Sequence, residues 1–133
     1  MKRCLLILLW VLGILFPMAF LGRSWPAFGR VFDLLFAPDW VHVVMHAFLY
    51  LVLGILLATW RRPAGVPAFL LQVVLVLLVG VFHEALQCLT AGRWPGWGPE
   101  LFDLGIDLSG GVLGIGLGIF WLNHRRPNSQ QVP

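Results

Sequence analysis

Polar side chains that could do chemistry are few in this sequence and fall into three short groups. His42 and His46 stand four residues apart, so a helix places both on one face. Gln87 follows the pair His83 and Glu84 at spacings of four and three residues, which allows it to share a helical face with either. The third group holds two carboxylates one turn apart, after an arginine. Together the candidate ligand-binding residues are His42, His46, Glu84, Gln87, Arg93, Asp103 and Asp107.

Glu84 is the candidate for acid–base chemistry. A partly buried carboxyl group can serve as general base or general acid, here with His83 or His46 as its proton partner. The residues from His83 to Gln87 resemble the H-E-x-x-H zinc helix but carry Gln at the second ligand position. A metal site would therefore need His42 or His46 from another segment. Neither a metal ion nor another cofactor is expected.

The elements that position these groups are long apolar segments. Of 133 residues, 59% are hydrophobic and 11% charged, whereas a soluble domain carries roughly one quarter charged residues. Four segments are long enough to cross a hydrocarbon core of about 30 Å as helices. The sequence therefore predicts an all-α, integral membrane four-helix bundle forming one domain over residues 1–133. The four predicted spans cover residues 4–21, 40–60, 66–90 and 104–122.

The first span could instead be a cleaved signal peptide, because Met1-Lys2-Arg3 precedes its apolar run. The run is long for a signal peptide and no A-x-A-like site follows it, so a retained helix is favoured.

Charge distribution predicts the orientation in the membrane, since short cytoplasmic loops are rich in Lys and Arg. With the N-terminus inside, one side holds six cations and no acid: Lys2, Arg3, Arg61, Arg62, Arg125 and Arg126. The other side holds Arg23, Arg30 and Arg93 with all the acids: Asp33, Asp39, Glu84, Glu100, Asp103 and Asp107. Both termini are therefore expected in the cytoplasm. The basic balance does not indicate a nucleic-acid partner, because the cations sit at helix ends.

This topology brings the three polar groups to the same outer slab of the bilayer. Ionisable side chains that face lipid cost at least ~2.5–3.5 kcal/mol near the centre of a span, so they normally turn inward and pair. The carboxylates are expected to meet the imidazoles and Arg93. Structural alternatives stay open: Asp103 could cap the last helix, and His42 and His46 could be plain interhelical hydrogen-bonders.

Small residues predict close packing of the last span. Gly110, Gly114 and Gly118 form two overlapping G-x-x-x-G units, which let another backbone approach. The stripe is expected to contact the second or third span, and a homodimer contact is the alternative use. The aromatic residues of the connections 22–39 and 91–102 are expected to lie at the membrane interface rather than to stack on a substrate.

Residues 39–118 resemble the VanZ-like membrane protein family. The likeness rests on His46 to Tyr50 with Gly54, on Glu84 to Gln87, on Arg93, and on Asp103 through Asp107 to Gly110 and Gly114. Two positions depart from the family pattern. The family usually has an Asp-Lys pair where this chain has His42-Val43, and it usually has Asn at the position of Asp107. The resemblance implies a multi-pass protein of the bacterial cytoplasmic membrane, linked to the cell envelope and to glycopeptide (teicoplanin) resistance.

Three classes of function follow. In the first, the outer polar cluster recognises a lipid-linked cell-wall precursor or a glycopeptide headgroup; the lack of a recognisable nucleophile motif around Ser109, Thr90 or Cys88 favours this class. In the second, the chain is an enzyme that acts on a lipid-linked substrate through Glu84. The third, transport or proton relay, is disfavoured because the polar groups stop halfway across the membrane.

Overall fold

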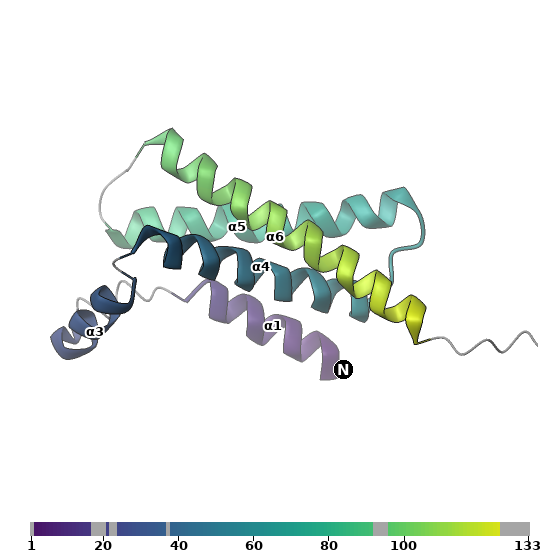
Figure 1. The fold of residues 1–133 in the computed structure, drawn as a ribbon, viewed down its shortest axis with the longest axis horizontal. Coiled ribbons are helices and arrows are strands. Elements are labelled where there is room, and N and C mark those ends of the chain that lie inside the picture. Colours follow the sequence, from purple (N-terminus) through teal and green to yellow (C-terminus); the bar gives the residue numbers. More distant parts are fainter. Residues whose placement is uncertain (1, 17–20, 22–23, 37, 92–95, 126–133) are drawn as a thin grey trace, which may run out of the picture.

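The computed structural model describes residues 2–16, 21, 24–36, 38–91 and 96–125, and within these ranges it leaves out the side chains of 32, 33, 36 and 91. The described residues form helices and no strands. The helices are α1 (Lys2–Ile14), α3 (Pro26–Phe36), α4 (Asp39–Trp60), α5 (Val66–Ala91) and α6 (Trp97–His124). Figure 1 shows α4, α5 and α6 side by side, with α1 along the outer side of α4. An all-α fold is thus confirmed.

Three of these helices, α4, α5 and α6, are long and apolar enough to cross a membrane. Within their most apolar windows only 33% of α4, 22% of α5 and 33% of α6 is buried inside the protein. The remaining apolar side chains face outward, as on Leu70, Leu78 and Leu113. Such a continuous apolar exterior is suited to lipid rather than water. These helices match three of the four predicted spans.

The first predicted span is shorter in the structure than in the sequence-based expectation. Helix α1 ends at Ile14, whereas the prediction ran to residue 21, and residues 17–20 of that prediction lie outside the described residues. A 13-residue helix reaches about 20 Å, less than the hydrocarbon core. Pro17 follows Phe16 in the sequence and disfavours helical geometry at the residue before it. A fourth full-length span therefore stays a prediction.

Helix α1 is antiparallel to α4, and two of its side chains donate hydrogen bonds to backbone carbonyls of α4. The indole nitrogen of Trp10 donates to the carbonyl oxygen of Leu49 at 2.9 Å. Nearer the N-terminus, the guanidinium of Arg3 donates to the carbonyl oxygen of Thr59. Ile14 is buried in the core at the other end of the helix. The N-terminal residues thus lie beside the end of α4.

Helix α3 occupies a segment that was expected to be a loop. Its apolar positions 28, 31, 32, 35 and 36 recur at helical spacing, and Pro26 stands at the first helical position, where its missing N–H is tolerated. Val31, Leu34 and Leu35 are exposed. An amphipathic helix with these side chains fits the interface between headgroups and acyl chains. The expected interfacial aromatic loop is therefore a short helix instead.

Helices α4 and α6 pack with their backbones in contact. A Cβ atom added at Gly110 would lie 2.5 Å from the carbonyl oxygen of Ala47, and one added at Gly114 would collide with the carbonyl oxygen of Leu51. On the α4 side, Gly54 meets Gly111 in the same way. Gly118 lies against α4 as well, beside Ala58. The glycine stripe thus packs against the second predicted span, and its face is occupied within the chain.

The turn between α4 and α5 is closed by the side chain of Gln72. Gly65 adopts a positive φ of 82° in this turn, a conformation that glycine accepts without strain. The amide nitrogen of Gln72 donates to the carbonyl oxygens of Leu57, at 3.3 Å, and Arg61, at 2.7 Å. These carbonyls stand at the end of α4, where helical partners run out; that of Leu57 also accepts from the backbone N–H of Arg61 at 3.0 Å. Gln72 therefore has a structural role.

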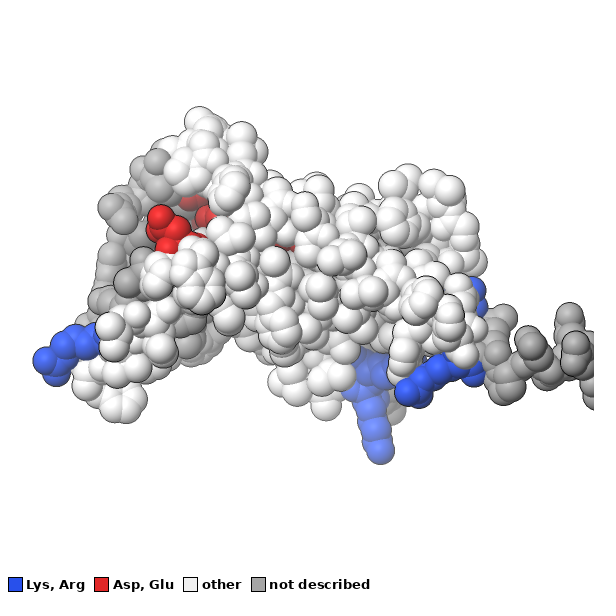
Figure 2. Space-filling model, viewed as in Figure 1, with Lys and Arg blue, Asp and Glu red and all other residues white. Residues whose placement is uncertain are grey.

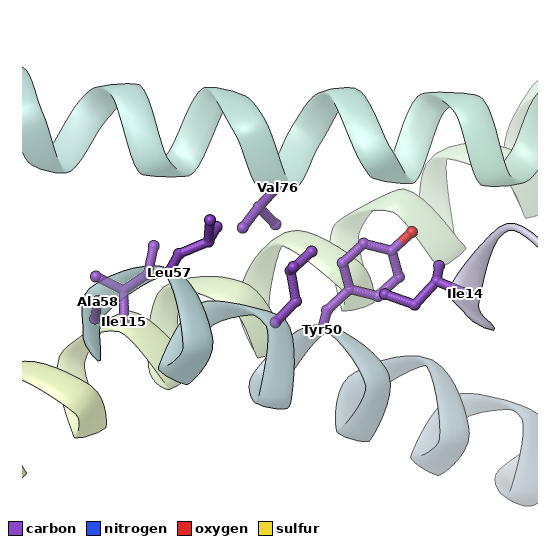
Figure 3. Close-up of a cluster of buried hydrophobic side chains, with 7 residues drawn as sticks. Ile14, Tyr50, Leu57, Ala58, Val76 and Ile115 are labelled. Carbon is purple, nitrogen blue, oxygen red and sulfur yellow. The ribbon is translucent and has the colours of Figure 1, made fainter. Parts of the chain in front are cut away.

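A small hydrophobic core lies where the helices meet. Its buried side chains come from α1, α4, α5 and α6: Ile14, Tyr50, Leu53, Leu57, Ala58, Val76 and Ile115. Figure 3 shows Tyr50 rising from α4 with its hydroxyl directed toward α5. The one polar group in this core thus points at the helix that carries His83 and Glu84.

Charged side chains divide between the two ends of the molecule. Figure 2 shows Lys and Arg gathered where the chain begins and α6 ends, apart from a basic side chain on α3, and carboxylates inside a hollow at the opposite end. The described cations of the first end are Lys2, Arg3, Arg61, Arg62 and Arg125. The two ends are called the basic end and the acidic end below.

Candidate polar site at the acidic end

Two imidazole–carboxylate pairs join α4 to α6. His46 Nδ1 donates to Asp107 Oδ1 at 2.9 Å, and His42 Nε2 donates to Asp103 Oδ2 at 3.2 Å. The two helices run in the same direction (Figure 1), so a four-residue step on each one moves from one pair to the next. The glycine contacts deeper in the bundle hold the helices close enough for both pairs to form.

Helix α5 adds its side chains to the inner pair. The ring of His83 stacks on that of His46, with centroids 5.1 Å apart and planes 16° apart. Glu84 Oε1 lies 3.8 Å from His46 Nδ1. The amide nitrogen of Gln87 donates to Nε2 of His83 at 3.1 Å, and Nδ1 of His83 donates to the hydroxyl oxygen of Tyr50 at 3.4 Å. One imidazole, His46, thus contacts groups from both neighbouring helices.

Burial increases along the cluster from the acidic end inward. The side chain of His42 is 41% exposed and that of Asp103 17%, whereas those of His46 and Asp107 are 4% and 1% exposed. Glu84 is also buried. The outer pair is therefore partly accessible to solvent, and the inner groups are shielded from it. A ligand that enters from this end meets His42 and Asp103 first.

The inner groups carry unused hydrogen-bonding capacity. Among the described residues, Oε1 of Glu84 and Oδ2 of Asp107 are buried and make no hydrogen bond. His46, His83, Glu84 and Asp107 each offer one ligand atom, and these four atoms lie within 4.8 Å of one another. Two carboxylates this close in a low-dielectric interior need a proton or a cation between them. The arrangement can exchange protons, accept donors from a headgroup, or hold a metal ion.

An open apolar groove runs along the outer surface of α4 and α6 beside the cluster. Its volume is about 720 Å³. Ala47, Phe102 and Ile106, which line it, are the chain neighbours of His46, Asp103 and Asp107. Polar and apolar binding surfaces therefore adjoin at this end of the bundle.

The structure brings together His42, His46, His83, Glu84, Gln87, Asp103 and Asp107, the predicted site residues that it describes. Arg93, the remaining one, lies outside the described residues. Asp103 does not cap its helix: α6 begins at Trp97 with Gly96 as its N-cap, so Asp103 lies in the second turn and pairs with His42.

Sequence reasoning missed Tyr50 as a member of the cluster. Tyr50 is fully buried and its hydroxyl contacts His83. Its spacing was the available signal, because 42, 46 and 50 form one stripe of i, i+4 positions. The cluster thus extends a further turn toward the middle of α4.

Comparison with known proteins gives no relative: no family model, no curated protein and no solved structure matches this chain.

Proposed function

We propose that this chain is a VanZ-like multi-pass protein of the bacterial cytoplasmic membrane that recognises a lipid-linked or glycopeptide headgroup at its acidic end. In this proposal both termini and the basic end face the cytoplasm, and the polar cluster opens toward the cell envelope. Recognition of a cell-wall precursor or of teicoplanin would link the chain to glycopeptide resistance.

The charge separation between the two ends supports this orientation. Cations in short connections mark the cytoplasmic side of membrane proteins, and the turn between α4 and α5 carries Arg61 and Arg62. Arg62 donates to the side-chain oxygen of Asn123 at 2.5 Å, so the end of α6 lies at the same level as this turn. The acids lie at the other end, which is therefore assigned to the outside.

Two tryptophans on α4 support the depth assigned to the cluster. Trp40 and Trp60 stand near the two ends of this helix and are exposed. The twenty helical steps from Trp40 to Trp60 span about 30 Å, the thickness of the hydrocarbon core. On this scale His46 lies about 9 Å below the outer interface and Tyr50 about 15 Å below it. The cluster is therefore reachable from the outer leaflet.

The single observation that carries the proposal is the adjacency of a polar cluster and an apolar groove on α4 and α6. An amphiphile has the matching shape: a headgroup for the polar cluster and a chain for the groove. The described cluster is rich in carboxylates and imidazoles, which accept hydrogen bonds. A headgroup with hydroxyl or ammonium donors, such as a sugar or an amine, fits this chemistry best.

The resemblance to VanZ-like proteins adds support because its residues converge in space. His46, Tyr50, Glu84, Gln87 and Asp107 come from three separate segments and belong to one contact network. If the resemblance were a coincidence of sequence order and spacing, its residues would not need to contact one another in the fold. Their meeting is what a shared binding site requires.

The alternative function is an intramembrane enzyme that acts on a lipid-linked substrate with Glu84 as acid or base. One observation favours it: His46 is oriented by Asp107 and lies 3.8 Å from Glu84. A carboxylate that orients an imidazole is a recurring support for proton transfer. Both functions would use the same cluster, so they differ in whether the bound substrate is chemically changed.

The test is binding to the purified protein in nanodiscs, with teicoplanin and a polyprenyl-linked disaccharide precursor as probes. Wild type is expected to bind one of them, and His46→Gln and Glu84→Gln to bind at least about tenfold more weakly, since each loses a buried charged partner. His124→Gln is the matched control, because His124 lies at the basic end and bonds only to its own helix among the described residues. Equal binding by all four proteins would overturn the proposal.

Mass spectrometry of the probe after incubation distinguishes the two functions. An unchanged mass supports recognition. A changed mass that depends on Glu84 assigns the chain to the enzymes.

A further inference from the structure

We propose that His46, His83, Glu84 and Asp107 form a binding site for one divalent transition-metal ion of the Zn²⁺ class. This inference goes beyond headgroup recognition, because it assigns a resident ion to the inner part of the cluster. It also departs from the sequence-based expectation of no metal, which rested on Gln87 at the second ligand position and on the need for an imidazole from another segment.

The geometry places a complete donor set around one point. The four ligand atoms lie within 4.8 Å of one another, and they come from α4, α5 and α6. Ligand atoms around tetrahedral zinc, at about 2.0–2.1 Å from the ion, are about 3.3 Å apart. Side-chain rotations that move each atom by about an ångström would close the set around an ion. Gln87 stands at the second histidine position of the H-E-x-x-H pattern, and His46 of α4 supplies the second imidazole of the set.

Charge balance supplies a reason for a dication at this point. Glu84 and Asp107 bring two carboxylates into a buried region, and His46 is the one basic partner that both reach among the described residues. One protonated imidazole offsets one negative charge, whereas a divalent ion offsets two. Charges inside a membrane protein are normally paired, so the ion completes a pairing that the side chains leave incomplete.

The unsatisfied oxygen of Glu84 is an independent observation. The side chain is 9% exposed, and among the described residues its Oε1 makes no hydrogen bond. A buried carboxylate oxygen without a donor is unfavourable by about 1–3 kcal/mol or more. Oε1 lies on the His46 side of the carboxyl group, at 3.8 Å from Nδ1, which is the direction of the other ligands.

His83 of α5 has hydrogen-bonding partners that could orient it as a metal ligand. The two ring nitrogens of His83 face Tyr50 and Gln87, so whichever nitrogen binds the ion, the other keeps a polar partner. Such partners fix the orientation of a metal-binding imidazole. Two imidazoles and two carboxylates favour Zn²⁺, Mn²⁺ or Fe²⁺ over Mg²⁺ and Ca²⁺, which prefer oxygen ligands alone.

The test is metal analysis of the full chain purified in detergent. The protein is stripped with a chelator, incubated with Zn²⁺ or Co²⁺, passed over a desalting column and analysed by mass spectrometry for bound metal. Wild type and the control His124→Gln are expected to retain one ion per chain. His83→Gln and Glu84→Gln are expected to bind at least about tenfold more weakly. Tetrahedral Co²⁺ absorption in the wild type, lost in both variants, reports the ligands directly.

Loss of metal through misfolding is separated by a second measurement. Zn²⁺ is expected to raise the thermal unfolding temperature of wild type and of His124→Gln, because a ligand that binds the native state stabilises it. Glu84→Gln keeps the size and shape of the side chain, so it should elute as a monodisperse protein and show no shift. Absence of a stoichiometric ion in wild type, or retention of as much metal by His83→Gln and Glu84→Gln as by wild type, would overturn the proposed metal site.

The headgroup proposal can fail independently. If chelator-treated protein binds a probe but never takes up metal, the headgroup proposal is supported and the metal site is overturned. A stoichiometric ion in a protein that binds neither probe would give the opposite result.

Discussion

Nδ1 of His46 donates a 2.9 Å hydrogen bond to Oδ1 of Asp107, and both side chains are almost completely buried between parallel helices. This bond joins α4 to α6 at the centre of the polar cluster. It stands one turn below the more exposed pair of His42 and Asp103. The free energy of the bundle and the chemistry of the site therefore depend on the same two side chains.

Asp107→Ala is expected to destabilise the protein by about 1–3 kcal/mol, because it leaves the buried His46 donor without an acceptor. Asp107→Asn keeps an acceptor oxygen at the same position and should lose less than half as much. The free energy of unfolding in mixed micelles, measured by titration with a denaturing detergent, compares the two variants. Similar losses for both would contradict a hydrogen-bonding role.

Gly114→Ala is expected to destabilise the protein by about 1–3 kcal/mol, since the new methyl group meets the carbonyl oxygen of Leu51 and forces the helices apart. Gly116→Ala is the matched control on the same helix, because nothing lies within 4 Å of its added Cβ. There the better helix former should leave stability unchanged or raise it by up to about 1 kcal/mol. Thermal unfolding of both variants measures the difference, and equal effects would rule out the close packing.

Gln72→Met removes the two hydrogen bonds to the end of α4 while keeping an unbranched side chain. Interhelical hydrogen bonds in membranes contribute about 0.6 kcal/mol on average and up to about 1.7, so a loss of about 1–2 kcal/mol is expected. Thr59→Val serves as the comparison, because the Thr59 hydroxyl bonds only within its own helix among the described residues. If the two variants unfold alike, Gln72 does not stabilise this turn.

The orientation can be tested with a membrane-impermeant maleimide in a background carrying Cys4→Ser and Cys88→Ser. Ala64→Cys, in the turn between α4 and α5, is expected to react only after the membrane is permeabilised. Gly98→Cys, in the first turn of α6, should react in intact spheroplasts. Both positions are exposed. Reaction of both from the same side would refute the assigned topology.

Long apolar segments were the most predictable part of the fold. Helices α4 and α5 begin and end within a residue of the predicted spans, because Pro38, Pro63 and Gly65 interrupt the helices at these points. Helix α6 begins at Trp97, earlier than the predicted residue 104. Its first turns carry Glu100 and Asp103, which a hydropathy criterion excludes although a helix accepts them.

Helix α3 was missed because the sequence was searched only for apolar segments long enough to span a membrane. Its 11 residues cannot cross a membrane, so the segment was interpreted as a loop with interfacial aromatics. The spacing of Phe28, Val31 and Leu35 already carried the helical period. A search for amphipathic periodicity, beside the search for apolar length, would have found this helix.

The pairing within the cluster could not be read from the sequence. Convergence of the polar groups follows from topology and from the cost of leaving ionisable groups in lipid. Which carboxylate meets which imidazole depends on the rotation of α4 against α6. That rotation is set by the contacts of Gly110 and Gly114 with Ala47 and Leu51, a property of two surfaces rather than of either segment.

The glycine contacts also determine which part of the bundle can rearrange. Where the backbones of α4 and α6 touch, there is no layer of side chains whose rotamers could absorb a displacement, so these helices act as one rigid body. Helix α5 meets that body through side chains instead: Leu104 reaches Gly80, and Val76 reaches Gly111. Tilting of α5 would widen the cluster by carrying His83 and Glu84 away from a stationary His46 and Asp107.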